Sequence, residues 1–78
     1  MFSERLKQCR LLHGLTLQKM ADILGISMRG YQYYESGSRE PNLDTLILIA
    51  DTFKVSTDWL LGRDDFLESL GVSFDEYL

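Results

Sequence analysis

Residues 16–35 constrain the fold more than any other part of the chain, because they carry the start and stop signals of two short helices. Thr16 and Ser27 each offer a side-chain oxygen that can accept a backbone N–H at the beginning of a helix. Gly25 lies where the chain needs a left-handed residue to end the first helix. A turn this tight favours two helices that cross steeply, so that one end of the second helix projects from the body.

Apolar residues in this segment recur at helical spacing. The side chains expected to face inward are Met20, Ala21 and Leu24 in the first helix and Tyr31 and Tyr34 in the second. The opposite side of the second helix carries side chains that are long, flexible or flat: Met28, Arg29, Gln32 and Tyr33. Because a projecting helix of this size fits the major groove of DNA, these four are the candidates for contact with base edges.

The rest of the chain predicts three more helices and no sheet, so the expected class is all-α with five helices. A first helix is expected over residues 3–13, with Ser3 as its cap. Asn42 can cap a fourth helix, and Ser56 a short fifth helix that Gly62 ends. The fourth helix is expected to bury a run of apolar residues: Leu43, Leu46, Ile47, Ile49, Ala50 and Phe53.

The net charge of −4 is unevenly distributed along the chain. Residues 1–63 contain all eight Lys and Arg and seven Asp and Glu, a net charge of +1, whereas residues 64–78 contain five acids and no base. We therefore divide the chain into a domain over residues 1–63 and an acidic tail over residues 64–78. A domain at +1 is weakly basic for a DNA-binding protein, so binding would depend on local basic groups, helix N-termini and a dimer.

Composition argues against several other classes of protein. The chain has no run of about 20 apolar residues that could span a membrane and no signal peptide, and its single cysteine cannot form an internal disulfide, so a cytoplasmic location is expected. Cys9 belongs to the expected inward stripe of Phe2, Leu6, Cys9 and His13 and is interpreted as a small buried hydrophobe. With one His, one Cys, no Gly-rich phosphate loop and no cluster of metal ligands, we predict no enzyme, cofactor or metal.

The tail is acidic and also rich in apolar residues. Asp64 and Asp65 could start a short helix through Leu70 that Gly71 ends, and Ser73 could cap one further turn. Leu11 and Leu48 point away from the inward stripes of their own helices. Either the tail folds back over these leucines or a second subunit covers them, and we favour a dimer built from the fifth helix and the tail.

From Phe2 to Gly62 the sequence resembles the Cro/phage-repressor (Xre-type) helix-turn-helix family. The segments that match this family are Leu6, Cys9 and Arg10; residues 14–16; Met20 and Ala21; residues 24–27; residues 34–37; and Pro41, Leu46, Ala50, Val55 and residues 58–62. The resemblance implies a five-helix DNA-binding domain of bacterial or phage origin. It also implies a repressor that binds a near-palindromic operator as a homodimer.

The resemblance also implies roles for individual residues. The positions that match phosphate-contacting residues are Thr16, Gln18, Lys19, Ser27, Ser36, Ser38 and Arg39. Many relatives have glutamine where this chain has Leu17 and glutamate where it has Lys19, so this chain replaces a polar side chain with an apolar one and an acid with a base. In relatives an arginine at the position of Arg10 pairs with a glutamate at that of Glu35, which predicts a structural ion pair here.

Each candidate has an alternative role. Arg29 could donate two hydrogen bonds to a guanine, or it could be a solvated arginine paired with a nearby acid. Gln32 could bond an adenine in two places, Tyr33 could contact a thymine methyl or a phosphate, and Met28 could make only apolar contacts. Ser27 could cap its helix alone or also contact a phosphate.

Two functions from different classes remain open. The first is sequence-specific binding of double-stranded DNA by a transcriptional regulator, most simply a repressor. The second is a protein-interaction module of the same fold, such as an antitoxin or anti-regulator, in which the acidic tail occupies a groove on a protein partner.

Overall fold

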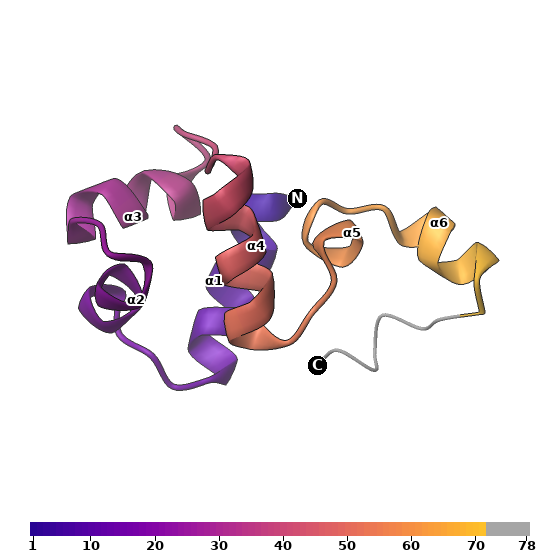
Figure 1. The fold of residues 1–78 in the computed structure, drawn as a ribbon, viewed down its shortest axis with the longest axis horizontal. Helices are drawn as coiled ribbons and strands as arrows, with labels where there is room; N and C mark the ends of the chain where they lie inside the picture. Colours follow the sequence, from indigo (N-terminus) through magenta and orange to yellow (C-terminus); the bar gives the residue numbers. More distant parts are fainter. Residues whose placement is uncertain (72–78) are drawn as a thin grey trace.

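A computed structural model of the chain describes residues 1–71, apart from the side chain of Leu67. It contains six helices, which are α1 (Phe2–Leu12), α2 (Leu17–Leu24), α3 (Met28–Ser36), α4 (Leu43–Phe53), α5 (Thr57–Leu60) and α6 (Asp64–Ser69) (Figure 1). Residues 1–71 hold no strand, so the all-α class is confirmed. The first five helices are the five predicted ones, and α6 is the helix predicted at the start of the tail. The further turn predicted at Ser73 lies outside the described residues.

The helix starts confirm four of the five predicted caps. The side-chain oxygens of Thr16, Ser27, Asn42 and Ser56 each accept the backbone N–H of the residue three positions on, with N···O distances of 2.8–3.0 Å. These bonds satisfy amide groups that the first turn of a helix leaves without a partner. The four helices α2–α5 therefore begin where their sequence signals predict.

The predicted cap at Ser3 is wrong. Helix α1 begins at Phe2, Met1 takes the cap position, and no side chain caps this helix. The carbonyl of Met1 already accepts the N–H of Arg5 at 3.2 Å, so the helical hydrogen bonds start before Ser3 is reached. A serine near the start of a helix indicates a cap only to within a residue or two.

One core joins α1–α5. Its buried apolar residues are Leu6, Cys9, Met20, Ala21, Tyr31, Leu46, Ile49, Ala50, Phe53, Val55, Trp59 and Leu60. Helix α3 packs against α1 and α2, and α4 packs against α2 and α5. Cys9 is 2% exposed, and burial raises the pKa of its thiol, so the interpretation as a small buried hydrophobe is confirmed.

The predicted inward stripes of α4 and α1 are only partly correct. Leu43 and Ile47 are 77% and 52% exposed although both were predicted to be buried. Residues 46–50 of α4 form an unbroken apolar run, so the pattern does not reveal which arc of the helix faces the core. Leu43 and Ile47 lie one turn apart beside that arc. His13, the last residue of the expected stripe and interpreted from the sequence as a solvated or half-buried histidine, is exposed, and its ring centre lies 4.9 Å from that of Phe53. Leu48 is exposed as predicted.

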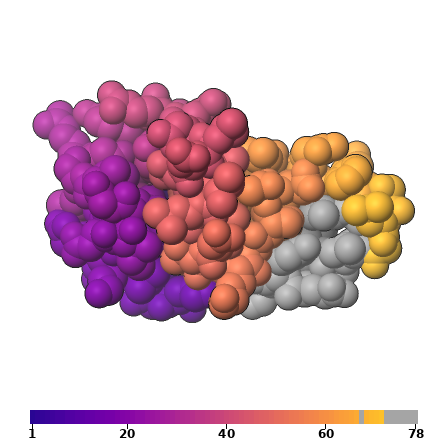
Figure 2. Space-filling model, in the orientation of Figure 1, coloured from indigo at the N-terminus to yellow at the C-terminus, as the bar shows by residue number. Residues whose placement is uncertain are grey.

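The molecule is elongated, with extents of 38 × 23 × 19 Å. Helices α2 and α3 lie at one end of the long axis, and α5 and α6 lie toward the other (Figure 1). The space-filling view shows the same separation between the N-terminal half, in indigo to magenta, and the orange to yellow end (Figure 2). The exposed side of α3 therefore lies far from the acidic α6.

Candidate nucleic-acid interface

The turn between α2 and α3 fixes how the second helix leaves the body. Gly25 ends α2 in the left-handed conformation, with φ of 69° and ψ of 31°. Its N–H donates to the carbonyl of Asp22 at 3.1 Å, and the N–H of Ile26 donates to the carbonyl of Ala21 at 3.0 Å. Ile26 then packs against the core. These two bonds fix how the chain leaves α2, and the Ser27 cap fixes where α3 begins.

The four predicted base-contacting residues lie where a duplex could approach α3. Met28, Arg29 and Gln32 are exposed, and Tyr33 is half-buried. On the opposite side of α3, Tyr31 is fully buried and Tyr34 packs against the core. The inward and outward sides of α3 are thus the predicted ones, while contact with DNA stays a prediction.

Tyr33 contacts two arginines, a feature that the sequence pattern did not reveal. The Nε–H of Arg29 donates to the Tyr33 hydroxyl at 3.1 Å. The guanidinium of Arg39, from the loop after α3, lies 5.1 Å from the centre of the same ring. Within residues 1–71, neither arginine has a carboxylate within ion-pair distance. The alternative in which Arg29 pairs with a nearby acid is therefore not seen.

All seven predicted phosphate-contacting residues are exposed: Thr16, Gln18, Lys19, Ser27, Ser36, Ser38 and Arg39. They come from the starts of α2 and α3 and from the end of α3 with its following loop. The Gln18 amide donates to Asp22 at 2.8 Å, and the hydroxyls of Ser36 and Ser38 lie 2.9 Å apart. The structure brings these residues to the α2–α3 end, and their contact with phosphate stays a prediction.

Arg10 and Glu35 form the predicted ion pair. The Nε–H and one Nη–H of Arg10 donate to the two Glu35 carboxylate oxygens at 2.6 and 3.2 Å. A third bond runs from Arg10 to the carbonyl of Leu15 at 2.9 Å. The Arg10 and Glu35 side chains are only 10% and 9% exposed. The hydrogen bond to Glu35 raises the pKa of Arg10 despite burial, and the pair ties α1 to the last turn of α3.

Burial beside the Arg10–Glu35 pair also raises the pKa of Tyr31. Removal from water is the main cause that raises the pKa of the Tyr31 phenol, and the Glu35 carboxylate adds to it. Tyr31 therefore keeps its proton and serves as a core residue of α3, as predicted.

Comparison with known proteins identifies the family. Residues 6–60 match the family model described as helix-turn-helix. This chain belongs to the Xre-type helix-turn-helix family. The match covers α2 and α3 together with most of α1 and all of α4 and α5.

Two curated relatives and one solved structure illustrate this membership. The chain is 52% identical over 61 residues to the SPbeta prophage-derived HTH-type transcriptional regulator YonR of Bacillus subtilis, covering 78% of this chain and 56% of YonR. It is 43% identical over 60 residues to the cryptic phage CTXphi transcriptional repressor RstR of Vibrio cholerae, covering 77% and 54%. A transcriptional regulator from Listeria innocua has a TM-score of 0.74 and 31% identity, covering 97% of this chain and 81% of that one. The chain thus spans a little over half the length of YonR and RstR.

Two further ion pairs between side chains of residues 1–71 lie away from α3 and were not predicted. Arg5 binds both carboxylate oxygens of Asp64 at 2.7 Å, and Arg63 donates to Asp58 at 2.9 Å. The hydrogen bonds from Arg5 hold the pKa of Asp64 below its ordinary value. Arg5 also donates to the carbonyl of Trp59 and lies over its ring. No local signal links residues 59 positions apart, so only the folded chain reveals this attachment of α6.

The predicted boundary at residue 63 stays a prediction, and the Arg5–Asp64 pair crosses it. Within the described residues, no group of three or more His, Cys, Asp or Glu side chains could hold a metal ion. None of the helices described is long and apolar enough to cross a bilayer.

Proposed function

We propose that this protein binds double-stranded DNA sequence-specifically and represses transcription as a homodimer on a near-palindromic operator. The observation that carries the proposal is the state of the cations at the α2–α3 end. Lys19, Arg29 and Arg39 are exposed there, and no carboxylate of residues 1–71 pairs with them. Cations without a carboxylate partner are available to phosphate oxygens and base edges.

The proposed contacts follow from the positions of these side chains. Arg29 and Gln32 read base edges from α3, Met28 adds apolar contact, and Tyr33 lies against the same groove wall. The phosphate contacts surround them, from the capped start of α2 to Arg39 in the loop. Because the domain is only weakly basic overall, much of the affinity comes from these few contacts doubled in a dimer.

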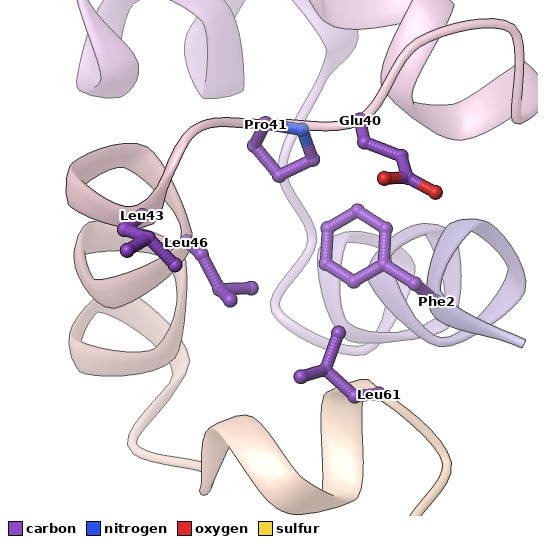
Figure 3. Close-up of a pocket in the computed structure, with 6 residues that line it drawn as sticks. All are labelled: Phe2, Glu40, Pro41, Leu43, Leu46 and Leu61. Atoms are coloured by element: carbon purple, nitrogen blue, oxygen red, sulfur yellow. The ribbon is translucent and has the colours of Figure 1, made fainter.

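An apolar hollow supports the proposed homodimer. It encloses about 270 Å³ and is lined by Phe2, Glu40, Pro41, Leu43, Leu46 and Leu61. Phe2, Leu46 and Leu61 point into it from α1, α4 and the end of α5 (Figure 3). At its rim Leu43 and Leu61 are 77% and 50% exposed. A second copy presenting the same face would cover these side chains in a two-fold contact. This surface includes the end of α5, as the sequence prediction did, but it contains neither the tail of that prediction nor Leu11 and Leu48.

Repression is the simplest mode of regulation for such a domain. A dimer that occupies an operator across two successive turns of the major groove excludes polymerase without any ligand. RstR, one of the relatives, is itself named a transcriptional repressor.

Salt-dependent gel shifts test the proposal on duplexes selected from random-sequence DNA. Arg29→Ala should relax sequence preference at one base pair by about 1–3 kcal/mol. Arg39→Ala should weaken all duplexes alike and reduce the salt slope. Lys54, which is exposed at the end of α4 and not at the α2–α3 end, provides the control variant Lys54→Gln, which should change neither. Equal loss of preference from Arg29→Ala and Arg39→Ala would refute the assigned roles.

Dimer formation has a separate test. Leu61→Asp places a charge in the apolar hollow and should shift sedimentation from dimer to monomer, whereas Leu11→Asp, on an exposed leucine of α1, should not. A wild-type protein that sediments as a monomer when bound to its selected duplex would contradict the homodimer.

A protein-interaction module remains the second candidate because α6 exposes an apolar and acidic surface. Phe66 and Leu70 are 41% and 63% exposed, and the acids Asp65 and Glu68 are exposed as well. Deleting residues 65–78 removes this surface but keeps Asp64 as the partner of Arg5. If the deletion abolishes regulation in cells while operator binding stays intact, the second candidate is favoured. If regulation and operator binding both persist, the tail has no role in either.

A further inference from the structure

Tyr33 connects recognition helix α3 to the loop that follows it. Its hydroxyl accepts the Nε–H of Arg29, one turn earlier in α3, at 3.1 Å. Its backbone carbonyl accepts the N–H of Arg39 at 3.2 Å, and its ring lies 5.1 Å from the Arg39 guanidinium. One tyrosine thus contacts two cations that come from different elements and have no carboxylate partner within residues 1–71.

We propose that Tyr33 is a positioning residue that presents Arg29 to a guanine through its two terminal nitrogens and holds Arg39 against the adjacent phosphate. This inference rests on the proposed function in DNA binding and assigns Tyr33 a different role from direct base contact. The inference also specifies that Arg29 contacts a guanine, and that it does so through the edge of the guanidinium formed by the two terminal nitrogens.

The choice of edge follows from the donors of an arginine. A guanidinium can bind guanine O6 and N7 either through both terminal nitrogens or through Nε and one terminal nitrogen. In the structure the Nε–H of Arg29 is already bonded to Tyr33. Only the edge formed by the two terminal nitrogens is therefore open, and its direction is set by the bond to a rigid neighbour on the same helix.

The role toward Arg39 depends on the ring instead of the hydroxyl. Arg39 belongs to the exposed Ser-Gly-Ser-Arg loop, where an arginine side chain would otherwise adopt many rotamers. The ring of Tyr33 limits this freedom by a cation–π contact. The two roles of Tyr33 can consequently be separated by substitution, because phenylalanine keeps the ring and leucine keeps neither group.

The first experiment measures binding by fluorescence anisotropy to a duplex selected from random-sequence DNA and to versions with each guanine replaced. Tyr33→Phe should reduce the preference at one guanine about three- to tenfold, the loss expected for one hydrogen bond, and leave the salt slope unchanged. Tyr33→Leu should reduce that preference and also the salt slope. Tyr34→Phe removes the hydroxyl of the neighbouring tyrosine and is the matched control, which should change neither quantity.

The second arm repeats the Tyr33→Phe substitution in an Arg29→Ala background. If Tyr33 acts through Arg29, the second substitution should have no further effect on base preference. A preference that still falls in that background would mean that Tyr33 touches the base itself and would overturn the proposal.

A readout without DNA separates this proposal from the proposed function. The Nε–H resonance of Arg29 in the free protein, observed by NMR, should be protected from exchange in wild type and lose that protection in Tyr33→Phe, while thermal stability stays the same. Equal exchange in both proteins overturns the positioning role even if operator binding is intact. If the Arg29 Nε–H is protected from exchange but the wild-type protein prefers no duplex sequence, the proposed function and the guanine contact are both overturned.

Discussion

The two ends of this domain differ in whether their exposed or partly exposed cations are paired with carboxylates. At the α2–α3 end Lys19, Arg29 and Arg39 are exposed and have no carboxylate partner within residues 1–71. Toward the α5–α6 end Arg5 and Arg63 are paired with Asp64 and Asp58. The comparison explains how a chain with a net charge of −4 can present a local basic surface, because the exposed cations at the α2–α3 end have no carboxylate partner within residues 1–71, and the arginine that is paired there, Arg10, is buried.

The largest expected effect is on stability and comes from breaking the buried Arg10–Glu35 ion pair, which ties α1 to the last turn of α3. Glu35→Ala leaves the buried Arg10 without its partner and should destabilise the fold by about 3–5 kcal/mol. Urea denaturation followed by circular dichroism measures this loss. Asp51→Ala, at an exposed acid of α4, is the control and should change stability by less than about 0.5 kcal/mol. A similar, small effect of both substitutions would show that Arg10–Glu35 is a surface pair in energetic terms.

A smaller effect is expected at the turn that directs α3. Gly25→Ala should cost about 1–2 kcal/mol, because Gly25 has a φ of 69° that an L-residue with a Cβ adopts under strain. A Cβ at this position would meet no atom within 4 Å, so the cost is one of backbone conformation and not of collision. Gly25→Asn should recover part of the stability, since asparagine tolerates this conformation better. Equal melting of the alanine and asparagine variants would contradict this explanation.

The contrast between the two ends has a direct test in DNA binding. Lys19→Gln should reduce the slope of log affinity against log salt by about 0.9 for each phosphate that is no longer neutralised, hence by about two in a dimer. Arg63→Gln should leave the slope unchanged, because Arg63 is paired with Asp58 and lies at the other end. An equal reduction in both variants would mean that pairing does not decide which cations meet DNA.

The smallest expected effect concerns the attachment of α6. Arg5 lowers the pKa of Asp64, so the pair contributes to stability above the ordinary aspartate value of about 3.9 and this contribution is lost as the pH falls through the lowered pKa. An NMR titration of the Asp64 carboxyl should show the lowered pKa in wild type and a value near the ordinary one in Arg5→Met. A titration unchanged by Arg5→Met would contradict the pairing in solution.

The sequence by itself determined the local elements of this protein. Caps at Thr16, Ser27 and Asn42 and the stop at Gly25 fixed α2, α3 and the start of α4, because each signal acts on backbone groups within a few residues. The outward side of α3 followed from helical periodicity. The Arg10–Glu35 pair was identified through family resemblance, which carries information on contacts that a single sequence lacks.

Tertiary structure decided what depends on residues far apart or on a choice among similar surfaces. Leu43 and Ile47 are exposed because neighbouring helices cover only one arc of α4, and the apolar residues of this helix extend beyond that arc. The pairing of Arg5 with Asp64, 59 positions apart, required the chain to close first. The contact of Tyr33 with Arg29 is instead local, because the two residues lie four positions apart in α3. The physical reason is range: a cap or a glycine acts within one helical turn, whereas burial and side-chain pairing depend on which elements meet.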